Sequence, residues 1–227
     1  MKHVITPPNT PVLPVSGTQN TFPVRRVYCI GRNYAAHAIE MGHDPDRDPP
    51  FFFQKNPDNL DPSGDFPYPA QSVHVHHEIE LAVALKTGGT NIPVDKALGH
   101  VYGYAVALDM TRRDRQAEAK KAGRPWDVAK AFERSAPIAP IVPSSVIGHP
   151  SKGKIQLLVN GTERQLGDLD QMIWKVPEMI SYLSDYFTLS AGDVILTGTP
   201  SGVGPVQKGD VMEAHIEGFE TLTVTVS

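Results

Sequence analysis

Two carboxylates, Glu78 and Glu80, lie two residues apart in a segment, residues 76–85, that is otherwise rich in apolar residues. The segment predicts a β-strand, in which both acids project from one face, about 6.5 Å apart along the strand, with His76 beside them. Neighbouring carboxylates in a partly buried strand repel each other and lose hydration, and a hard divalent cation between them would keep both ionised. The small alanines that follow on the same face leave room for a ligand. A solvent-exposed face of an edge strand would carry the same acids without a metal, and this pattern alone leaves both interpretations open.

A third carboxylate, Asp109, follows a second predicted strand over residues 101–108. Asp109 shares its face of that strand with glycine and alanine, as the two glutamates share theirs with alanine. If the two strands are neighbours in one sheet, the three carboxylates converge over a floor of small residues.

His37 and Glu40 are three residues apart on a short predicted helix, residues 34–41, which Asn33 would cap and Gly42 would end. Residues at this spacing can touch on one helix face. The following segment, residues 43–50, is rich in proline and aspartate and predicts a loop. A helix that carries a His-Glu pair beside such a loop fits a catalytic lid, and it equally fits a surface helix with an incidental ion pair.

Further polar side chains lie close to these motifs in the sequence. Arg113 and Gln116 would continue from Asp109 along a helix that begins near Thr111 and ends at Gly123. Lys130 stands in an apolar stretch, where a snorkelling lysine and a catalytic lysine look alike. The last two candidates are Lys55, which ends a predicted strand over residues 51–55, and Thr199, which lies in a glycine-rich turn.

The glycine-rich turn, residues 197–204, lacks the Gly-Lys-Ser/Thr of a phosphate loop, so nucleotide binding is not expected. Its glycines would let backbone amides and Thr199 approach a small anion. Elsewhere, Asn160-Gly161 predicts a two-residue hairpin turn, and the apolar spacing over residues 177–187 predicts an amphipathic helix.

The 227-residue chain suits one large domain, and we expect an irregular N-terminal arm over residues 1–24 and a single catalytic domain over residues 25–227. A net charge of -4 without a basic run argues against a nucleic-acid partner. No apolar run reaches membrane-spanning length and no signal peptide is evident, so we expect no membrane partner and a cytoplasmic location. The single cysteine, Cys29, excludes an internal disulfide and a zinc site built from cysteines.

Taken together, these motifs resemble the fumarylacetoacetate hydrolase family over roughly residues 25–226. The residues that carry the resemblance are Gly31-Arg32-Asn33-Tyr34 with His37 and Glu40, His76 to Leu81, Leu108 to Thr111, Trp126 to Lys130, and Leu196 to Pro200. The resemblance implies an α+β fold, a mixed β-rich roll with barrel-like closure and a few short helices. It also implies a homodimer and a Mg²⁺ or Mn²⁺ ion bound by Glu78, Glu80 and Asp109.

Within the family, the chain is similar to the small single-domain branch that acts on acylpyruvates. The loop residues 41–45 and 49–55 are most similar to those of fumarylpyruvate hydrolases of gentisate breakdown, an aromatic catabolic route. The resemblance thus implies metal-dependent cleavage of a carbon–carbon bond in a small diketo acid. His37, oriented by Glu40, would activate a water.

Other residues would contact the substrate. Lys130, Gln116 and Thr199 match family positions that position it and stabilise the oxyanion. Arg32, Arg113 and Lys55 are candidates for anion contacts, including the far carboxylate of a fumaryl group.

Two alternatives stay open at this point. Oxaloacetate decarboxylation or isomerisation of a hydroxymuconate-type diacid could use the same metal site. A non-catalytic, metal-stabilised binding protein would need only the three acids, and the His37-Glu40 pair argues against it because a structural site has no use for a poised base.

Overall fold

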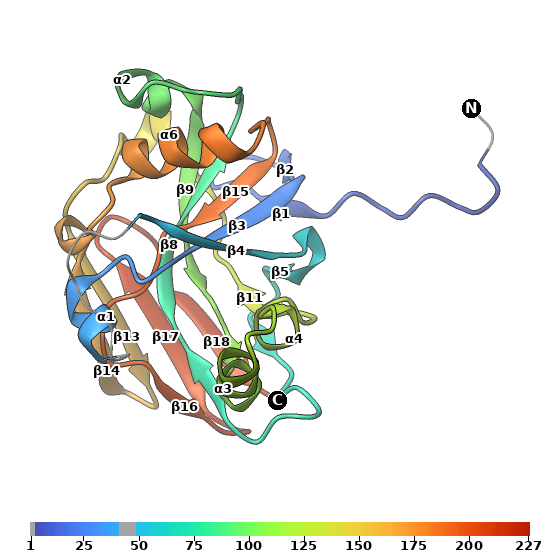
Figure 1. The fold of residues 1–227 in the computed structure, drawn as a ribbon, viewed down its shortest axis with the longest axis vertical. Helices are drawn as coiled ribbons and strands as arrows, with labels where there is room; N and C mark the ends of the chain where they lie inside the picture. Colours follow the sequence, from blue (N-terminus) through green and yellow to red (C-terminus); the bar gives the residue numbers. More distant parts are fainter. Residues whose placement is uncertain (1–2, 41–48) are drawn as a thin grey trace.

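The computed structural model describes residues 3–40 and 49–227, apart from the side chains of residues 38–40 (Figure 1). Residues 41–48, which include the end of the predicted lid helix and most of the predicted loop, lie outside the described part. The helices are α1 Ala35–Glu40, α2 Val94–Ala97, α3 Arg113–Ala122, α4 Asp127–Lys130, α5 Ser144–Ile147 and α6 Val176–Tyr186. Of these, α1, α3 and α6 correspond to helices predicted from the sequence. Single 3₁₀ turns are η1 Pro57–Asn59, η2 Leu98–His100 and η3 Leu169–Gln171. No helix within these described ranges is long and apolar enough to cross a membrane.

A six-stranded mixed sheet forms the centre of the molecule. Its order is β12 Val142–Pro143, β9 Val101–Leu108, β8 Ile79–Leu85, β15 Asp193–Leu196, β3 Arg26–Gly31 and β4 Phe51–Lys55. The β8–β9 pair is antiparallel and places Glu80 opposite Ala107. The two strands predicted to carry the acids are therefore neighbours.

A second, five-stranded sheet packs against the first. Its order is β14 Thr162–Asp168, β13 Lys154–Val159, β17 Val211–Ile216, β18 Leu222–Val226 and β6 Asp65–Phe66. The β13–β14 hairpin turns at Asn160 and Gly161, both with positive φ, which confirms the predicted turn. Apolar side chains of both sheets, together with the inner face of α6, form the larger hydrophobic core.

Three small sheets complete the fold. They are β1 Val12–Pro14 with β2 Thr21–Pro23, β5 Leu60–Asp61 with β11 Ala136–Pro137, and β10 Thr111–Arg112 with β7 Val75–His77 and β16 Gly204–Val206. Figure 1 shows residues before β1 extending away from the body of the molecule. Leu13 and Phe22, by contrast, are buried in a second core on the outer face of the central sheet. The predicted boundary at residue 24, between an N-terminal arm and a catalytic domain, stays a prediction.

The β-rich α+β architecture is as expected, with two differences. The described strands form open sheets, and no closed barrel is found among them. The strand predicted over residues 76–85 is split at Glu78, because β7 and β8 belong to different sheets. The alanines that follow Glu80 do not line a ligand space, since Ala82 and Ala84 are packed into the second core.

Candidate active site

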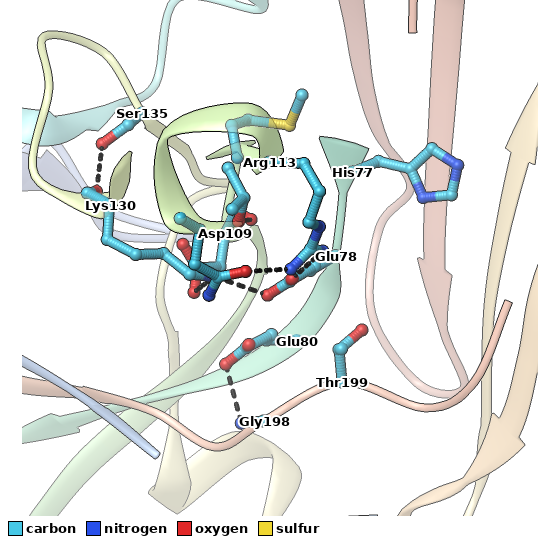
Figure 2. A network of polar contacts seen from close by, with 12 residues as sticks. His77, Glu78, Glu80, Asp109, Arg113, Lys130, Ser135, Gly198 and Thr199 are labelled. Carbon is cyan, nitrogen blue, oxygen red and sulfur yellow. Dashed lines mark hydrogen bonds and ion pairs between the residues drawn. The ribbon is translucent and has the colours of Figure 1, made fainter. Parts of the chain in front are cut away.

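Three buried carboxylates converge at one end of the β8–β9 pair. Glu78 occupies the break between β7 and β8, Glu80 lies in β8, and Asp109 directly follows β9. Since Glu80 faces Ala107, the register brings Asp109 beside Glu78, and the Asp109 amide donates to the Glu78 carbonyl oxygen at 2.8 Å. One carboxylate oxygen from each acid lies within 4.8 Å of the others. The structure therefore brings the three predicted ligands together (Figure 2).

Cationic side chains contact two of the three acids. Lys130 Nζ donates to Glu78 Oε2 and to Asp109 Oδ2, each at 2.7 Å, and Arg113 Nη2 donates to Glu78 Oε1 at 2.5 Å. Burial acts to raise the pKa of Glu78, but the charges of Lys130 and Arg113 outweigh it and hold the pKa below its usual value. Burial likewise acts to lower the pKa of Lys130, and the two carboxylates raise it. Glu78 and Lys130 are thus both held in their charged forms.

Glu80 has a different environment. Its Oε2 accepts a hydrogen bond from the Gly198 amide at 2.7 Å, and no cationic side chain of the described residues lies within ion-pair distance. Burial, followed by the charges of Asp109 and Glu78, raises its pKa well above the usual value. This backbone amide of the glycine-rich turn thus contacts the protein's own carboxylate, and the predicted contact of the turn with a small anion stays a prediction. Gly198 has φ +93, and a Cβ there would lie 2.8 Å from the Asn33 side chain.

The donor set fits a hard divalent cation. All three candidate ligands offer carboxylate oxygens, which suit Mg²⁺ or Mn²⁺. Glu80 has no ion-pair partner among the described residues, so a cation bound beside it would neutralise its charge. Asp109 Oδ1 faces the buried Lys55 ammonium at 2.9 Å, so the ion would share the Asp109 carboxylate with that lysine.

The triad opens into a cavity of about 430 Å³, part of which is solvent space. Most of the predicted functional side chains line it: His37, Arg32, Arg113, Gln116, Lys130 and Thr199. His37 is buried in α1 at 7 % exposure, and Gln116 Oε1 accepts from Arg113 Nη1 at 2.6 Å. Glu40 is the last residue of α1, and its side chain lies outside the described part, so its pairing with His37 stays a prediction.

Lys55 is placed differently from the prediction. Its ammonium is fully buried behind Asp109, 2.9 Å from Asp109 Oδ1, and it is not among the residues that line the cavity. It also donates to Ser135 Oγ at 2.9 Å and to the Lys130 carbonyl oxygen. This position does not match the predicted substrate contact and fits a role in fixing Asp109 and the chain at Lys130.

Sequence reasoning missed Gln165, which is 1 % exposed and supports the site from β14. Its Nε2 donates to Thr199 Oγ1 at 2.8 Å, and its Oε1 accepts from the Ile79 amide at 3.1 Å. The surrounding strand, Thr162–Asp168, is almost entirely polar, so no alternation marks Gln165 as an inward-facing residue.

His76, expected beside the glutamates, instead contacts His74, with 3.1 Å between their Nε2 atoms.

A comparison with protein families agrees with this geometry. The model of the fumarylacetoacetate (FAA) hydrolase C-terminal family matches residues 26–227. The chain belongs to this family. The match covers all the candidate functional side chains described above, and it begins just after β2.

Members of the family with known structures or names are similar over nearly the whole chain. A crystal structure of fumarylpyruvate hydrolase from Pseudomonas aeruginosa, in complex with Mn²⁺ and pyruvate, superposes with a TM-score of 0.97 at 51% identity, covering 99% of each chain. The oxaloacetate tautomerase FAHD1 of Arabidopsis thaliana is 42% identical, over 88% of this chain and 90% of the relative. The oxaloacetate tautomerase YcgM of Escherichia coli is 41% identical, over 89% of this chain and 93% of the relative.

Proposed function

We propose that the protein is a divalent-metal-dependent acylpyruvate hydrolase, with fumarylpyruvate as substrate and fumarate and pyruvate as products. The observation that carries the proposal is the arrangement of His37 and Lys130 around the Glu78, Glu80 and Asp109 triad in one cavity. The similar Pseudomonas aeruginosa structure, which contains Mn²⁺ and pyruvate, supports Mn²⁺ or Mg²⁺ as the ion and a pyruvyl group as its partner. When bound, the ion would hold the carboxylate and 2-oxo oxygens of the substrate and neutralise charge that develops there.

In the proposed reaction, His37 removes a proton from a water that attacks the distal carbonyl carbon of the acylpyruvate. The placement of His37, which is buried and lines the same cavity as Glu78 and Glu80, supports this role. The new C–O bond forms an oxyanion, whose collapse breaks the bond between C3 and C4. The electron pair passes to C3, which takes up the proton, and the products are a carboxylic acid and pyruvate.

Lys130 is the group best placed to stabilise the oxyanion. Its buried ammonium lies at the boundary between the triad and the cavity, where a developing negative charge is poorly screened by water. Gln116 and Thr199 supply further hydrogen-bonding groups in the cavity lining, and Arg32 and Arg113 supply positive charge. Lys55 would act indirectly, through its contacts with Asp109 and Lys130.

A second candidate activity is supported by the two relatives named as oxaloacetate tautomerases. Keto–enol conversion of oxaloacetate requires a base beside an ion-bound 2-oxo acid, and His37 and the triad could supply both. Oxaloacetate decarboxylation or isomerisation of a hydroxymuconate-type diacid would use the same groups. A non-catalytic binding protein is less well supported, because the cavity joins the triad to a histidine and a lysine.

Product identification tests these activities. Purified protein with Mg²⁺ or Mn²⁺, with and without chelator, would be incubated with fumarylpyruvate, acetylpyruvate, oxaloacetate and a hydroxymuconate-type diacid, and the products followed by NMR. We expect chelator-sensitive formation of fumarate and pyruvate as the fastest reaction. Faster turnover of oxaloacetate than of either acylpyruvate would favour the second candidate.

The homodimer and the cytoplasmic location stay predictions. Analytical ultracentrifugation would test the first, and cell fractionation would test the second.

A further inference from the structure

A second cavity, of about 730 Å³ including open solvent space, adjoins the first. It is lined by residues 51–54 of β4, by residues 124–126 between α3 and α4, and by Asp127 and Lys130 of α4. Phe53, Trp126 and Lys130 line both cavities, so these three side chains form the boundary between them. The second cavity is therefore the space next to the triad cavity, across these three side chains.

The chain forms this second cavity through a turn at the end of α3. Gly123 ends the helix with φ +61, and the Arg124 amide donates to the Ala119 carbonyl oxygen at 2.9 Å. The chain then reverses towards β4, where Trp126 meets Phe51 edge-on, with 4.9 Å between ring centroids. Phe53 lies 5.8 Å from the same indole. The resulting aromatic wall suits a flat, unsaturated chain.

Positive charge accumulates around this wall. Arg124 lines the second cavity, Arg32 Cζ lies 5.6 Å from the Phe51 ring centroid, and Lys120 Nζ lies 5.2 Å from that of Trp126. Among the described residues, none of these three cations has a carboxylate within ion-pair distance. The pKa of Lys120 is lowered, first by burial and then by the charges of Arg113 and Arg32. The acidic side chain that lines the second cavity is Asp127. The surroundings thus carry excess positive charge and favour an anion.

We infer that the second cavity binds the distal acyl chain of the substrate and that Arg124 pairs with a carboxylate at the end of that chain. The protein would thereby select dicarboxylic acylpyruvates of about the length of fumarylpyruvate over short, uncharged acyl groups. This inference rests on the proposed function for the placement of the pyruvyl end, and it deepens that proposal by naming a specificity-determining residue.

Binding of inert analogues tests the inference without turnover. Calorimetry on the Mn²⁺-loaded protein would compare 2-oxoheptanedioate with 2-oxoheptanoate, which differ only in the terminal carboxylate. We expect the diacid to bind about tenfold or more tightly, because its terminal carboxylate can accept a charge-assisted hydrogen bond from Arg124. Arg124→Gln should abolish that preference and leave the affinity for the monoacid unchanged. The matched control, Lys121→Gln, alters an exposed neighbour that lines neither cavity and should keep the preference.

Equal binding of diacid and monoacid to the wild-type protein would overturn the inference, as would an unchanged preference in Arg124→Gln. These outcomes are independent of the reaction catalysed. If the wild-type protein hydrolyses no acylpyruvate but prefers the diacid through Arg124, the proposed function fails and the distal site stands. If it hydrolyses fumarylpyruvate, Arg124→Gln should lower kcat/KM for that substrate about tenfold. The kcat/KM for acetylpyruvate, which has no distal carboxylate, should stay within about twofold of the wild-type value.

Discussion

Gln165 and Thr199 are joined by a hydrogen bond of 2.8 Å between the Gln165 amide nitrogen and the Thr199 hydroxyl oxygen. The same nitrogen donates to the Pro200 carbonyl oxygen at 2.9 Å, and the amide oxygen accepts from Ile79 N and His77 Nδ1. One side chain of the five-stranded sheet therefore fixes two parts of the site. It fixes the turn that carries Thr199 and the backbone between the two glutamates.

We predict that Gln165→Leu impairs both stability and catalysis. The substitution removes the partners of four buried polar groups, so the free energy of unfolding should fall by about 2–4 kcal/mol in urea titrations. At saturating metal, kcat/KM should fall at least about tenfold, because Thr199 and the triad backbone lose their support. Gln207→Leu, at an exposed position, is the matched control. A variant with lowered stability and unchanged kinetics would show that Gln165 has no positioning role.

The sequence was sufficient to predict several of the elements that carry the site, among them β9 and α3, because each has a strong local signal. Asn160-Gly161 has the backbone preference of a tight hairpin, and Gly123 ends α3 with the expected left-handed conformation. The alternation over residues 101–108 predicted β9 and the position of Asp109 relative to its small-residue face. The β8–β9 pairing then brings that face beside the two glutamates.

The sequence could not predict features that depend on long-range packing. The break at Glu78 arises because β7 pairs with β10 and β16 rather than continuing in the central sheet. Lys55 ends its strand like a solvated lysine, and only the fold places it 2.9 Å from an Asp109 oxygen. Gln165 lies in a strand of almost uniform polarity, so its burial depends on partners contributed by distant segments.

Asp114 anchors the helix that carries Arg113 and Gln116. Its carboxylate accepts hydrogen bonds from Ser72 Oγ, Val73 N and Arg115 N. Burial acts to raise the pKa of Asp114, but these bonds outweigh it and the pKa is lowered. Because the folded protein then binds the proton less readily than the unfolded chain, this contribution to stability is present above about pH 4 and is lost as the pH falls through the lower folded value.

We therefore predict that Asp114→Asn lowers the free energy of unfolding by about 1 kcal/mol at pH 7, and that the difference from wild type shrinks below about pH 4. Urea titrations across this range would measure it. Asp185→Asn, at an exposed position on α6, is the control. A difference that is constant between pH 7 and pH 3 would contradict the role assigned to the carboxylate.

Glu80 is predicted to be essential for binding the divalent ion. Added Mn²⁺ should stabilise the wild-type protein by about 2.7 kcal/mol at a free concentration one hundred times Kd, and chelator should remove the effect. Glu80→Gln keeps an oxygen that can accept from Gly198 N but loses the charge, so Mn²⁺ should no longer raise its Tm. Glu213→Gln, on β17, is the control. Unchanged calorimetric affinity in Glu80→Gln would remove Glu80 from the ligand set.

His37→Ala should separate catalysis from metal binding. If His37 is the base, kcat should fall by about 10²-fold or more. The calorimetric affinity for Mn²⁺ should stay the same, since the triad oxygens come from other residues. His215→Ala, on β17 and hydrogen-bonded to Thr221, gives a matched control. Near-normal turnover in His37→Ala would make the assignment of the base wrong.

Lys130 is predicted to have opposite effects on metal binding and on catalysis. Its ammonium lies 2.7 Å from one oxygen of Glu78 and from one of Asp109, so it competes with a cation for these oxygens. Lys130→Met should bind Mn²⁺ at least as tightly as the wild type, while kcat falls by about 10²-fold or more because the oxyanion loses its buried positive charge.

The stability of Lys130→Met provides a second measurement. Without metal, the variant removes one of the two cations that contact Glu78 and one of the two that contact Asp109, and Arg113 and Lys55 remain. It should lose about 1.5–3 kcal/mol of unfolding free energy in urea titrations. Added Mn²⁺ should restore part of this loss, because the ion replaces the missing charge. Lys121→Met, at the exposed end of α3, should differ from wild type in none of these respects. If Lys130→Met bound Mn²⁺ more than tenfold more weakly, Lys130 would support the metal site and would not compete with the ion.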